Sequence, residues 1–106
     1  MNGYRIAERA RSDLKEIARY TRMRWGSRQL KTYMRQLASR FNWLVENPKI
    51  GKRRPDIGPK IQSFPEGEHI IFYRSSTEGI EIVAVVHKSM DVNDLVVREE
   101  PRSSGL

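Results

Sequence analysis

The apolar residues between positions 30 and 45 recur with the period of an α-helix, and this pattern constrains the fold more than any other. They stand at i, i+3, i+4, i+7, i+11, i+14 and i+15: Leu30, Tyr33, Met34, Leu37, Phe41, Leu44 and Val45. Such spacing places them on one face of a helix. We expect the helix to end before Pro48, because proline disfavours the helical conformation of the residue preceding it.

A second apolar stripe precedes the first and is also helical: Leu14, Ile17, Ala18, Thr21 and Trp25. Gly26 then suits a helix C-terminus, and Ser27 suits the N-cap of the next helix. Two helices joined by so short a turn must fold back on each other as an antiparallel hairpin. We expect Trp25 and Phe41 to lie in the core that this hairpin covers.

The remaining segments favour β-strands. One is "YRIAE" at residues 4–8, and three more follow at hairpin spacing: "KIQSF", "HIIFYRS" and "GIEIVAVVH". The turn-like "PEGE" and "STEG" separate them. Continuous apolar residues from Ile82 to Val86 predict a central strand covered on both faces. The sequence thus predicts an α+β fold of two layers, β-α-α-β-β-β, with the helical hairpin packed on a small, mostly antiparallel sheet.

One domain accounts for the chain, since 106 residues is the usual size of a single domain. We place it at residues 1–98 and predict a flexible C-terminal tail at 99–106, where no periodicity remains. Residues 47–60, "NPKIGKRRPDIGPK", are punctuated by Pro and Gly and are predicted to form a basic loop.

Charge is distributed unevenly along the chain. Residues 1–60 hold sixteen Lys and Arg against five Asp and Glu, whereas residues 61–106 hold four against eight. A basic half of this strength attracts polyanions, either nucleic acid or an acidic protein.

Several classes of site are not expected. The chain has no cysteine, which excludes disulfides and thiolate metal sites and fits a reducing, cytoplasmic location. We see no signal peptide or membrane-spanning segment. His69 and His87 are the only histidines and lie on different predicted strands without a carboxylate cluster, so we expect no metal site and no cofactor.

The order of these segments resembles the ParE branch of the RelE/ParE superfamily of bacterial toxins. The stretches that carry the resemblance span residues 4–91: "YRIAERARSDLKEIARYT", "RWG", "NPKIGKRRPDI", "GEHIIFYRSSTEGIEIVAVVH" and "KSMD". The resemblance implies a toxin that inhibits DNA gyrase, blocks replication and is neutralised by a ParD-like antitoxin. It also implies that operator DNA is bound only through the antitoxin, with which the chain could form a hetero-oligomer.

Two alternatives remain open. The first is a RelE-like, ribosome-dependent endoribonuclease that uses His87, Arg74 and Tyr73. Its chemistry requires a general base, a general acid and cations around the phosphate, yet residues 61–97 carry only Arg74 and Lys88 as basic groups. Asp91 and Asp94 would repel a phosphate. We therefore expect His87 to be structural, hydrogen-bonded to a backbone group or to Asp91. The second alternative is a non-toxic corepressor that retains only antitoxin binding.

Candidate contact residues fall into two sets. Those predicted to meet the target begin with two arginines in what should be an exposed projection of the loop and continue on the sheet and beyond it: Arg53, Arg54, Arg74, His87, Met90 and Asp91. Those predicted to meet the antitoxin lie beside the main helical stripes, where aromatic and Met side chains make good anchors: Tyr20, Met23, Trp43 and the cation Arg24.

Overall fold

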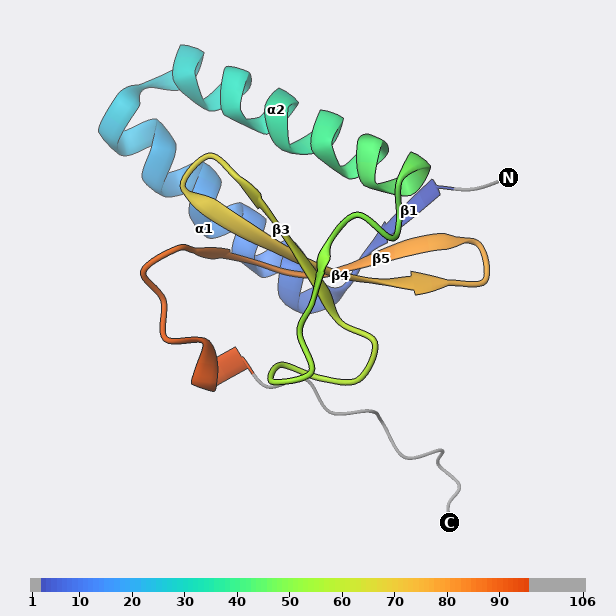
Figure 1. Cartoon of the computed structure of the whole chain (residues 1–106). Coiled ribbons are helices and arrows are strands. Elements are labelled where there is room, and N and C mark those ends of the chain that lie inside the picture. The colour runs from blue at the N-terminus through green and yellow to red at the C-terminus, as the bar shows by residue number, and fades with distance from the viewer. Residues whose placement is uncertain (1–2, 96–106) are drawn as a thin grey trace.

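The computed structural model describes residues 3–95 and has the predicted two layers (Figure 1). Its elements follow in the order β1 (Gly3–Ile6), α1 (Glu8–Trp25), α2 (Ser27–Glu46), β2 (Lys52–Arg53), β3 (Gln62–Glu66), β4 (His69–Ser76), β5 (Gly79–His87) and the 3₁₀-helix η1 (Val92–Leu95). The prediction of an α+β fold with a helical hairpin on a mostly antiparallel sheet is confirmed. The predicted tail at 99–106 lies outside the described residues.

The sheet has the strand order β1-β5-β4-β3-β2. Strand β1 runs parallel to β5, and the other three pairings are antiparallel. The prediction that 82–86 is central is confirmed, because β5 lies between β1 and β4 and these five residues are buried. The prediction of an uninterrupted loop at 47–60 missed β2, whose two residues pair with Gln62 and Ser63 of β3.

The helical hairpin turns at Gly26, whose φ of 92° is a left-handed conformation that glycine adopts without strain. Gly26, rather than Ser27, is the N-cap residue of α2, and Ser27 is its first helical residue. Phe41 is buried as predicted. The prediction that Trp25 belongs to the core is wrong: it is 64% exposed, because the turn of the hairpin projects past the end of the sheet (Figure 1).

Asp13 joins the hairpin to the sheet. The ladder between β4 and β5 slips by one residue, since Phe72 faces Ala84 while Tyr73 faces Ile82. The Asp13 carboxylate of α1 accepts a hydrogen bond from the backbone N–H of Val85 at 3.0 Å, and Val85 lies beyond Ile82, the last residue of β5 that pairs with β1.

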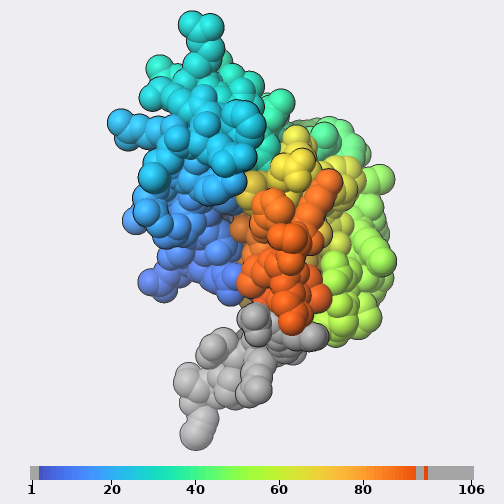
Figure 2. Space-filling model, turned by 90° about the vertical axis from the view of Figure 1, so that its left-hand side faces the viewer, coloured from blue at the N-terminus to red at the C-terminus, as the bar shows by residue number. Residues whose placement is uncertain are grey.

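Two apolar clusters lie on opposite faces of the sheet. The first fills the space under the helices and includes Leu37, Phe41, Tyr73 and Ile82. The second lies on the face away from the helices and comprises Ile57, Ile61, Phe72, Val83, Ala84, Val86 and Leu95. Figure 2 shows the helices on one side of the strand ends and the loop that follows α2 on the other. That loop and η1 therefore act as a cover for part of the second face.

Candidate functional site

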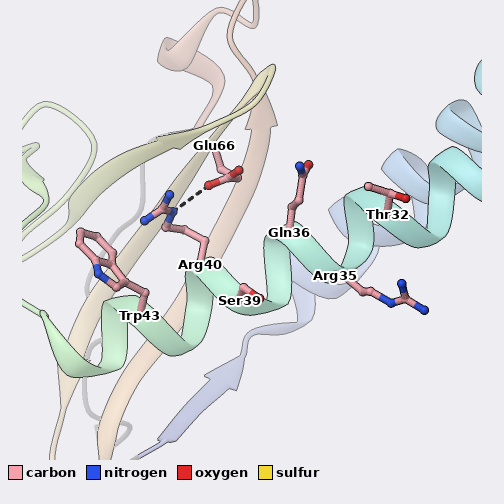
Figure 3. A pocket seen from close by; sticks show the side chains of 7 residues that line it. All are labelled: Thr32, Arg35, Gln36, Ser39, Arg40, Trp43 and Glu66. Atoms are coloured by element: carbon pink, nitrogen blue, oxygen red, sulfur yellow. Dashed lines mark hydrogen bonds and ion pairs between the residues drawn. The ribbon is translucent and has the colours of Figure 1, made fainter.

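A groove of about 500 Å³ runs along the outer side of α2 beside the end of β3. Its lining residues follow the helix at intervals of one turn and meet one residue of the strand (Figure 3): Thr32, Arg35, Gln36, Ser39, Arg40, Trp43 and Glu66. The helical period produces the groove directly, because residues three and four apart on a helix share one face.

Arg40 fixes the wall of this groove. Its Nε donates a hydrogen bond to the Glu66 carboxylate at 2.7 Å (Figure 3). The guanidinium lies 4.7 Å from the centre of the Trp43 ring and 5.1 Å from that of Phe64. Trp43 and Phe64 are themselves 5.1 Å apart between ring centres. The indole is thus held in place while 36% of Trp43 remains exposed, which makes a rigid apolar anchor point.

Three cations continue the groove towards the hairpin turn. Arg28, Lys31 and Arg35 are exposed and stand at i, i+3 and i+7 on α2. None of them forms an ion pair with a carboxylate of residues 3–95. The outer side of α2 therefore offers unpaired positive charge at one end and an aromatic anchor at the other. A partner segment with acidic groups and an apolar end would match both.

The predicted anchors on α1 are exposed in the structure. Tyr20 is 62% and Met23 is 78% exposed, and with Arg24 they stand at i, i+3 and i+4 on one side of the helix. Arg24 also lies 5.5 Å from the Trp25 ring. We call Tyr20, Met23 and Arg24 the α1 patch. It lies near the hairpin turn and is separate from the groove along α2, which we call the α2 groove. Their role as antitoxin contacts remains a prediction.

The two loop arginines have different environments. Arg53 is exposed, as expected. Arg54 is not, and the expectation that it projects into solvent is wrong: its side chain is 17% exposed and makes a two-point ion pair with Asp56 at 3.1 and 2.9 Å. Its guanidinium lies 5.4 Å from the Phe72 ring. The hydrogen bond from Arg54 lowers the pKa of the Asp56 carboxyl, and the same pair raises the pKa of Arg54.

Arg53 instead belongs to a notch of about 420 Å³ that sequence reasoning missed. Lys49, Lys60, Gln62 and Ser75 line it together with Arg53. The pairing of β2 with β3 brings these residues together, since Arg53 lies opposite Gln62. The basic composition of the loop was visible in the sequence, but the short strand that gathers Lys49, Arg53 and Lys60 was not.

The residues that a ribonuclease would use do not converge. Tyr73 is fully buried; its hydroxyl donates to the backbone oxygen of Pro48 at 3.0 Å and accepts from the N–H of Gly51 at 2.9 Å. Burial raises the pKa of the Tyr73 hydroxyl. Arg74 follows Tyr73 on the strand and so faces the opposite side of the sheet, where Glu81 pairs with it at 3.0 Å. Glu81 also pairs with Arg5, at 2.9 Å.

His87 is exposed at the end of β5. Its Nδ1 accepts a hydrogen bond from the backbone N–H of Ser89 at 3.1 Å and lies 2.8 Å from the Ser89 hydroxyl oxygen. The expected contact with a backbone group is therefore present. Met90 is partly buried against the second apolar cluster, and Asp91 is exposed. Their role in target binding remains a prediction.

His69 lies directly opposite His87 in the strand pairing, with ring centres 5.6 Å apart. Its Nδ1 is 2.7 Å from the Tyr33 hydroxyl oxygen, and that hydroxyl donates to the backbone oxygen of Glu66 at 3.0 Å. Burial, and secondarily the charge of His87, lower the pKa of His69. Burial raises the pKa of Tyr33 to about 12.

Among the side chains that the structure describes, no three from His, Asp or Glu come close enough together to hold a metal ion. Neither helix within the described residues 3–95 is long and apolar enough to cross a bilayer.

Residues 4–92 match the family of the ParE toxin of the type II toxin–antitoxin system parDE. Toxin ParE1 of Caulobacter vibrioides is 33% identical, with 86% of this chain and 94% of that protein aligned. Toxin ParE1 of Mycobacterium tuberculosis is 36% identical, with 85% of this chain and 93% of that protein aligned. A chain of the chromosomal ParDE system from P. aeruginosa has the same fold, with a TM-score of 0.67, 18% identity and coverage of 82% of this chain and 96% of that one.

Proposed function

This chain belongs to the ParE toxin family of type II toxin–antitoxin systems, and from that premise we propose that it inhibits DNA gyrase and is neutralised by a ParD-like antitoxin seated in the α2 groove. The observation that carries the proposal is the family match over residues 4–92. The choice of the groove as the antitoxin site and of gyrase as the target each have further support in the arrangement of side chains.

The α2 groove supports antitoxin binding because it combines the two properties that a specific protein interface needs. Trp43, held between Arg40 and Phe64, provides a rigid aromatic surface that loses little side-chain entropy when covered. The unpaired cations of α2 provide attraction for an acidic segment and raise its association rate. An acidic antitoxin segment that ends in an apolar side chain would satisfy both.

A binding measurement with purified antitoxin tests this placement. We expect Trp43→Ala to raise the dissociation constant for the antitoxin at least about tenfold, because truncating a central aromatic anchor commonly costs about 2 kcal/mol of binding free energy or more. Ile50→Ala is the matched control, since Ile50 is an exposed apolar residue that lines neither the α2 groove nor the α1 patch. Met23→Ala reports on the α1 patch. Full affinity in Trp43→Ala would rule out the groove.

The positions of Tyr73, Arg74 and His87 argue against cleavage of messenger RNA and therefore favour gyrase as the target. The Tyr73 hydroxyl is buried and already engaged by two backbone groups. Arg74 is neutralised by Glu81 and lies on the other face of the sheet from Tyr73. Only His87 is exposed at a strand end, and general acid–base catalysis requires a partner group within hydrogen-bond reach of the same substrate.

Two assays distinguish these targets. Purified toxin should inhibit supercoiling by gyrase and increase the amount of cleaved DNA trapped with the enzyme, and its induction in cells should elicit the SOS response and filamentation. Cleavage of messages on translating ribosomes, abolished by His87→Ala, would overturn the proposal in favour of a ribonuclease. Antitoxin binding without any growth effect would indicate the corepressor.

A further inference from the structure

Each of the five side chains that line the notch beside β2 ends in a hydrogen-bond donor, and three of the five are cations. Lys49, Arg53 and Lys60 supply three cations, Ser75 a hydroxyl, and Gln62 a side-chain amide. The Gln62 amide donates one of its two N–H bonds to the backbone oxygen of Gly51 at 3.2 Å, which leaves the other available. No carboxylate lines the notch, so nothing in its wall would repel an anion.

These cations are not used by the fold. Six ion pairs join the side chains that the structure describes, and none of them involves Lys49, Arg53 or Lys60. The contrast with Arg54, the next residue after Arg53, is direct: Arg54 is covered and paired with Asp56, whereas Arg53 is exposed and unpaired. Of the five basic residues of this loop, Arg54 packs against the protein itself, whereas three others, Lys49, Arg53 and Lys60, line the open notch.

The backbone conformation of Lys60 is a second, independent observation that supports a functional site at the notch. It is the only residue other than glycine, within the part of the chain that the structure describes, with a positive φ, at 64°. This left-handed conformation strains an ordinary side chain, and glycine or asparagine would relieve the strain. A lysine in a strained backbone position at the entrance to β3 is the kind of outlier that marks a functional site.

We propose that the Lys49–Arg53–Lys60 notch binds consecutive phosphates of a nucleic-acid backbone. A single free phosphate at so exposed a site would interact weakly in high dielectric. A strand presents several phosphates to three cations at once and also releases counterions on binding. The inference deepens the proposed function, because DNA is the substrate of gyrase, but the contact itself needs no gyrase and can be measured without it.

Direct binding of a fluorescent DNA oligonucleotide to the full-length toxin at several salt concentrations tests the proposal. Each phosphate contact contributes about 0.9 to the slope of log affinity against log salt for duplex DNA and about 0.7 for single strands. We expect Lys49→Gln and Arg53→Gln each to reduce the slope by about one contact and to weaken binding several-fold at low salt, regardless of sequence. Lys52→Gln is the matched control, because Lys52 is an exposed neighbour on the same strand that does not line the notch.

Lys60→Asn separates binding from folding. Asparagine tolerates the left-handed backbone, so the melting temperature should stay the same or rise while DNA affinity falls. A loss of both would show that Lys60 serves the fold and would count against the notch. The opposite directions of the two effects make this variant informative even if other substitutions destabilise the loop.

Further measurements distinguish a nucleic-acid backbone from free phosphate and from the carboxylates of a protein as the ligand of the notch. DNA affinity that is equal in the notch variants and the Lys52→Gln control would overturn the proposal. So would inorganic phosphate that competes with the oligonucleotide at an equal concentration of phosphate groups, since the ligand would then be a free anion. Loss of antitoxin affinity instead of DNA affinity would identify a carboxylate contact with protein. Failure of gyrase inhibition with intact, notch-dependent DNA binding would refute the proposed target and leave this site standing.

Discussion

At the scale of single residues, Tyr73 ties the segment that follows α2 to the sheet. Its hydroxyl accepts from the N–H of Gly51 and donates to the oxygen of Pro48, so one buried oxygen satisfies two backbone groups. A side chain at position 51 would collide with the Tyr73 hydroxyl, which explains a glycine there. The same tyrosine that was a candidate catalyst in the sequence is therefore an anchor for the loop.

Replacing Tyr73 with Phe should lower the free energy of unfolding by roughly 1–3 kcal/mol, because the buried N–H of Gly51 loses its partner. Urea unfolding of the variant and the parent measures the difference. Tyr20→Phe is the control, since the Tyr20 side chain is exposed and should change stability by less than about 0.5 kcal/mol. A neutral effect of Tyr73→Phe would mean that water replaces the hydroxyl.

His69 should make stability depend on pH. Burial and the charge of His87 lower its pKa in the folded protein below the usual 6.5. In the range between these two pKa values the unfolded chain binds more protons than the folded chain, so the free energy of unfolding decreases as pH falls through 6.5. The stability that neutral His69 contributes is therefore fully present above pH 6.5 and is lost as the pH falls towards the lower pKa of His69 in the folded protein.

The free energy of unfolding is measured from pH 8 to 5 in the parent and in His69→Gln. The difference between the two pH profiles is the contribution of His69. We expect the variant to have a flatter profile in this range. His87→Gln should raise the pKa of His69, visible in the NMR titration of its ring protons, because the repelling charge is removed. Identical profiles for the parent and His69→Gln would contradict the coupling.

Residue-level predictions from the sequence succeeded where local pattern decides and failed where distant contacts decide. Exposure of Tyr20 and Met23 followed from their places beside the helical stripe. Trp25 lies on the stripe yet is exposed, because no strand extends under the hairpin turn. Arg53 and Arg54 are adjacent and chemically identical, but Arg54 pairs with Asp56 beside the Phe72 ring, whereas Arg53 lines the notch.

At the scale of elements, the loop that follows α2 is a structural cover. Ile57 and Ile61 are buried against Phe72 and Val83 on the face of the sheet that the helices leave free. Arg54 strengthens the cover by pairing with Asp56 and lying on the Phe72 ring. The face of the sheet away from the helices is thus partly closed by the chain itself.

Ile57→Ala should destabilise the protein by roughly 2–5 kcal/mol, the usual cost of emptying a fully buried isoleucine site. Ile50→Ala, in the same loop but exposed, should cost far less. Chemical denaturation measures both, and hydrogen exchange should show faster exchange of the Arg54 N–H, which bonds to the oxygen of Ile61. Equal stability of the two variants would show that the cover contributes little.

The helices and three long strands were predictable because each has a clear period and clear turn residues. Strand β2 was not, because two residues carry no periodicity and become a strand only through pairing with β3. The continuous apolar run of β5 indicated two covered faces, and the structure shows that the second cover is a loop rather than a helix. Most residues of the α2 groove share one face of a single helix, so helical spacing alone could have predicted the groove. The residues of the notch come together only through the pairing of β2 with β3, so the sequence could not have predicted it.

At the scale of the whole molecule, charge separates the surfaces. The basic residues of the first sixty positions supply the unpaired cations of α2 and of the notch, while the strands of the second half hold carboxylates such as Glu66 and Glu81 that pair with arginines. The excess of basic residues in the first sixty positions predicted an anionic partner. The structure places the unpaired cations at two separate sites, the α2 groove and the notch, for which we propose a protein segment and nucleic-acid phosphates respectively.

Neutralising Arg28, Lys31 and Arg35 together with Gln should slow association with the antitoxin about tenfold or more at low salt, because these charges steer the encounter. Stopped-flow kinetics gives the rate constants. The dissociation rate should change much less, and the difference in association should vanish near 1 M salt, where the screening length is about 3 Å. A difference that persists at high salt would indicate direct contacts instead of steering.

The pairing of β1 with β5 has a consequence for synthesis. Gly3 lies beside Gly79 and Ile6 beside Ile82, so β1 cannot join the sheet until β5, the last strand that the structure describes, has been synthesised. Pairing across so much intervening sequence is slow compared with local hairpin formation. A nascent chain therefore has its helical hairpin available while its sheet is still incomplete, and the apolar face of α2 that packs on the sheet stays uncovered until β5 is made.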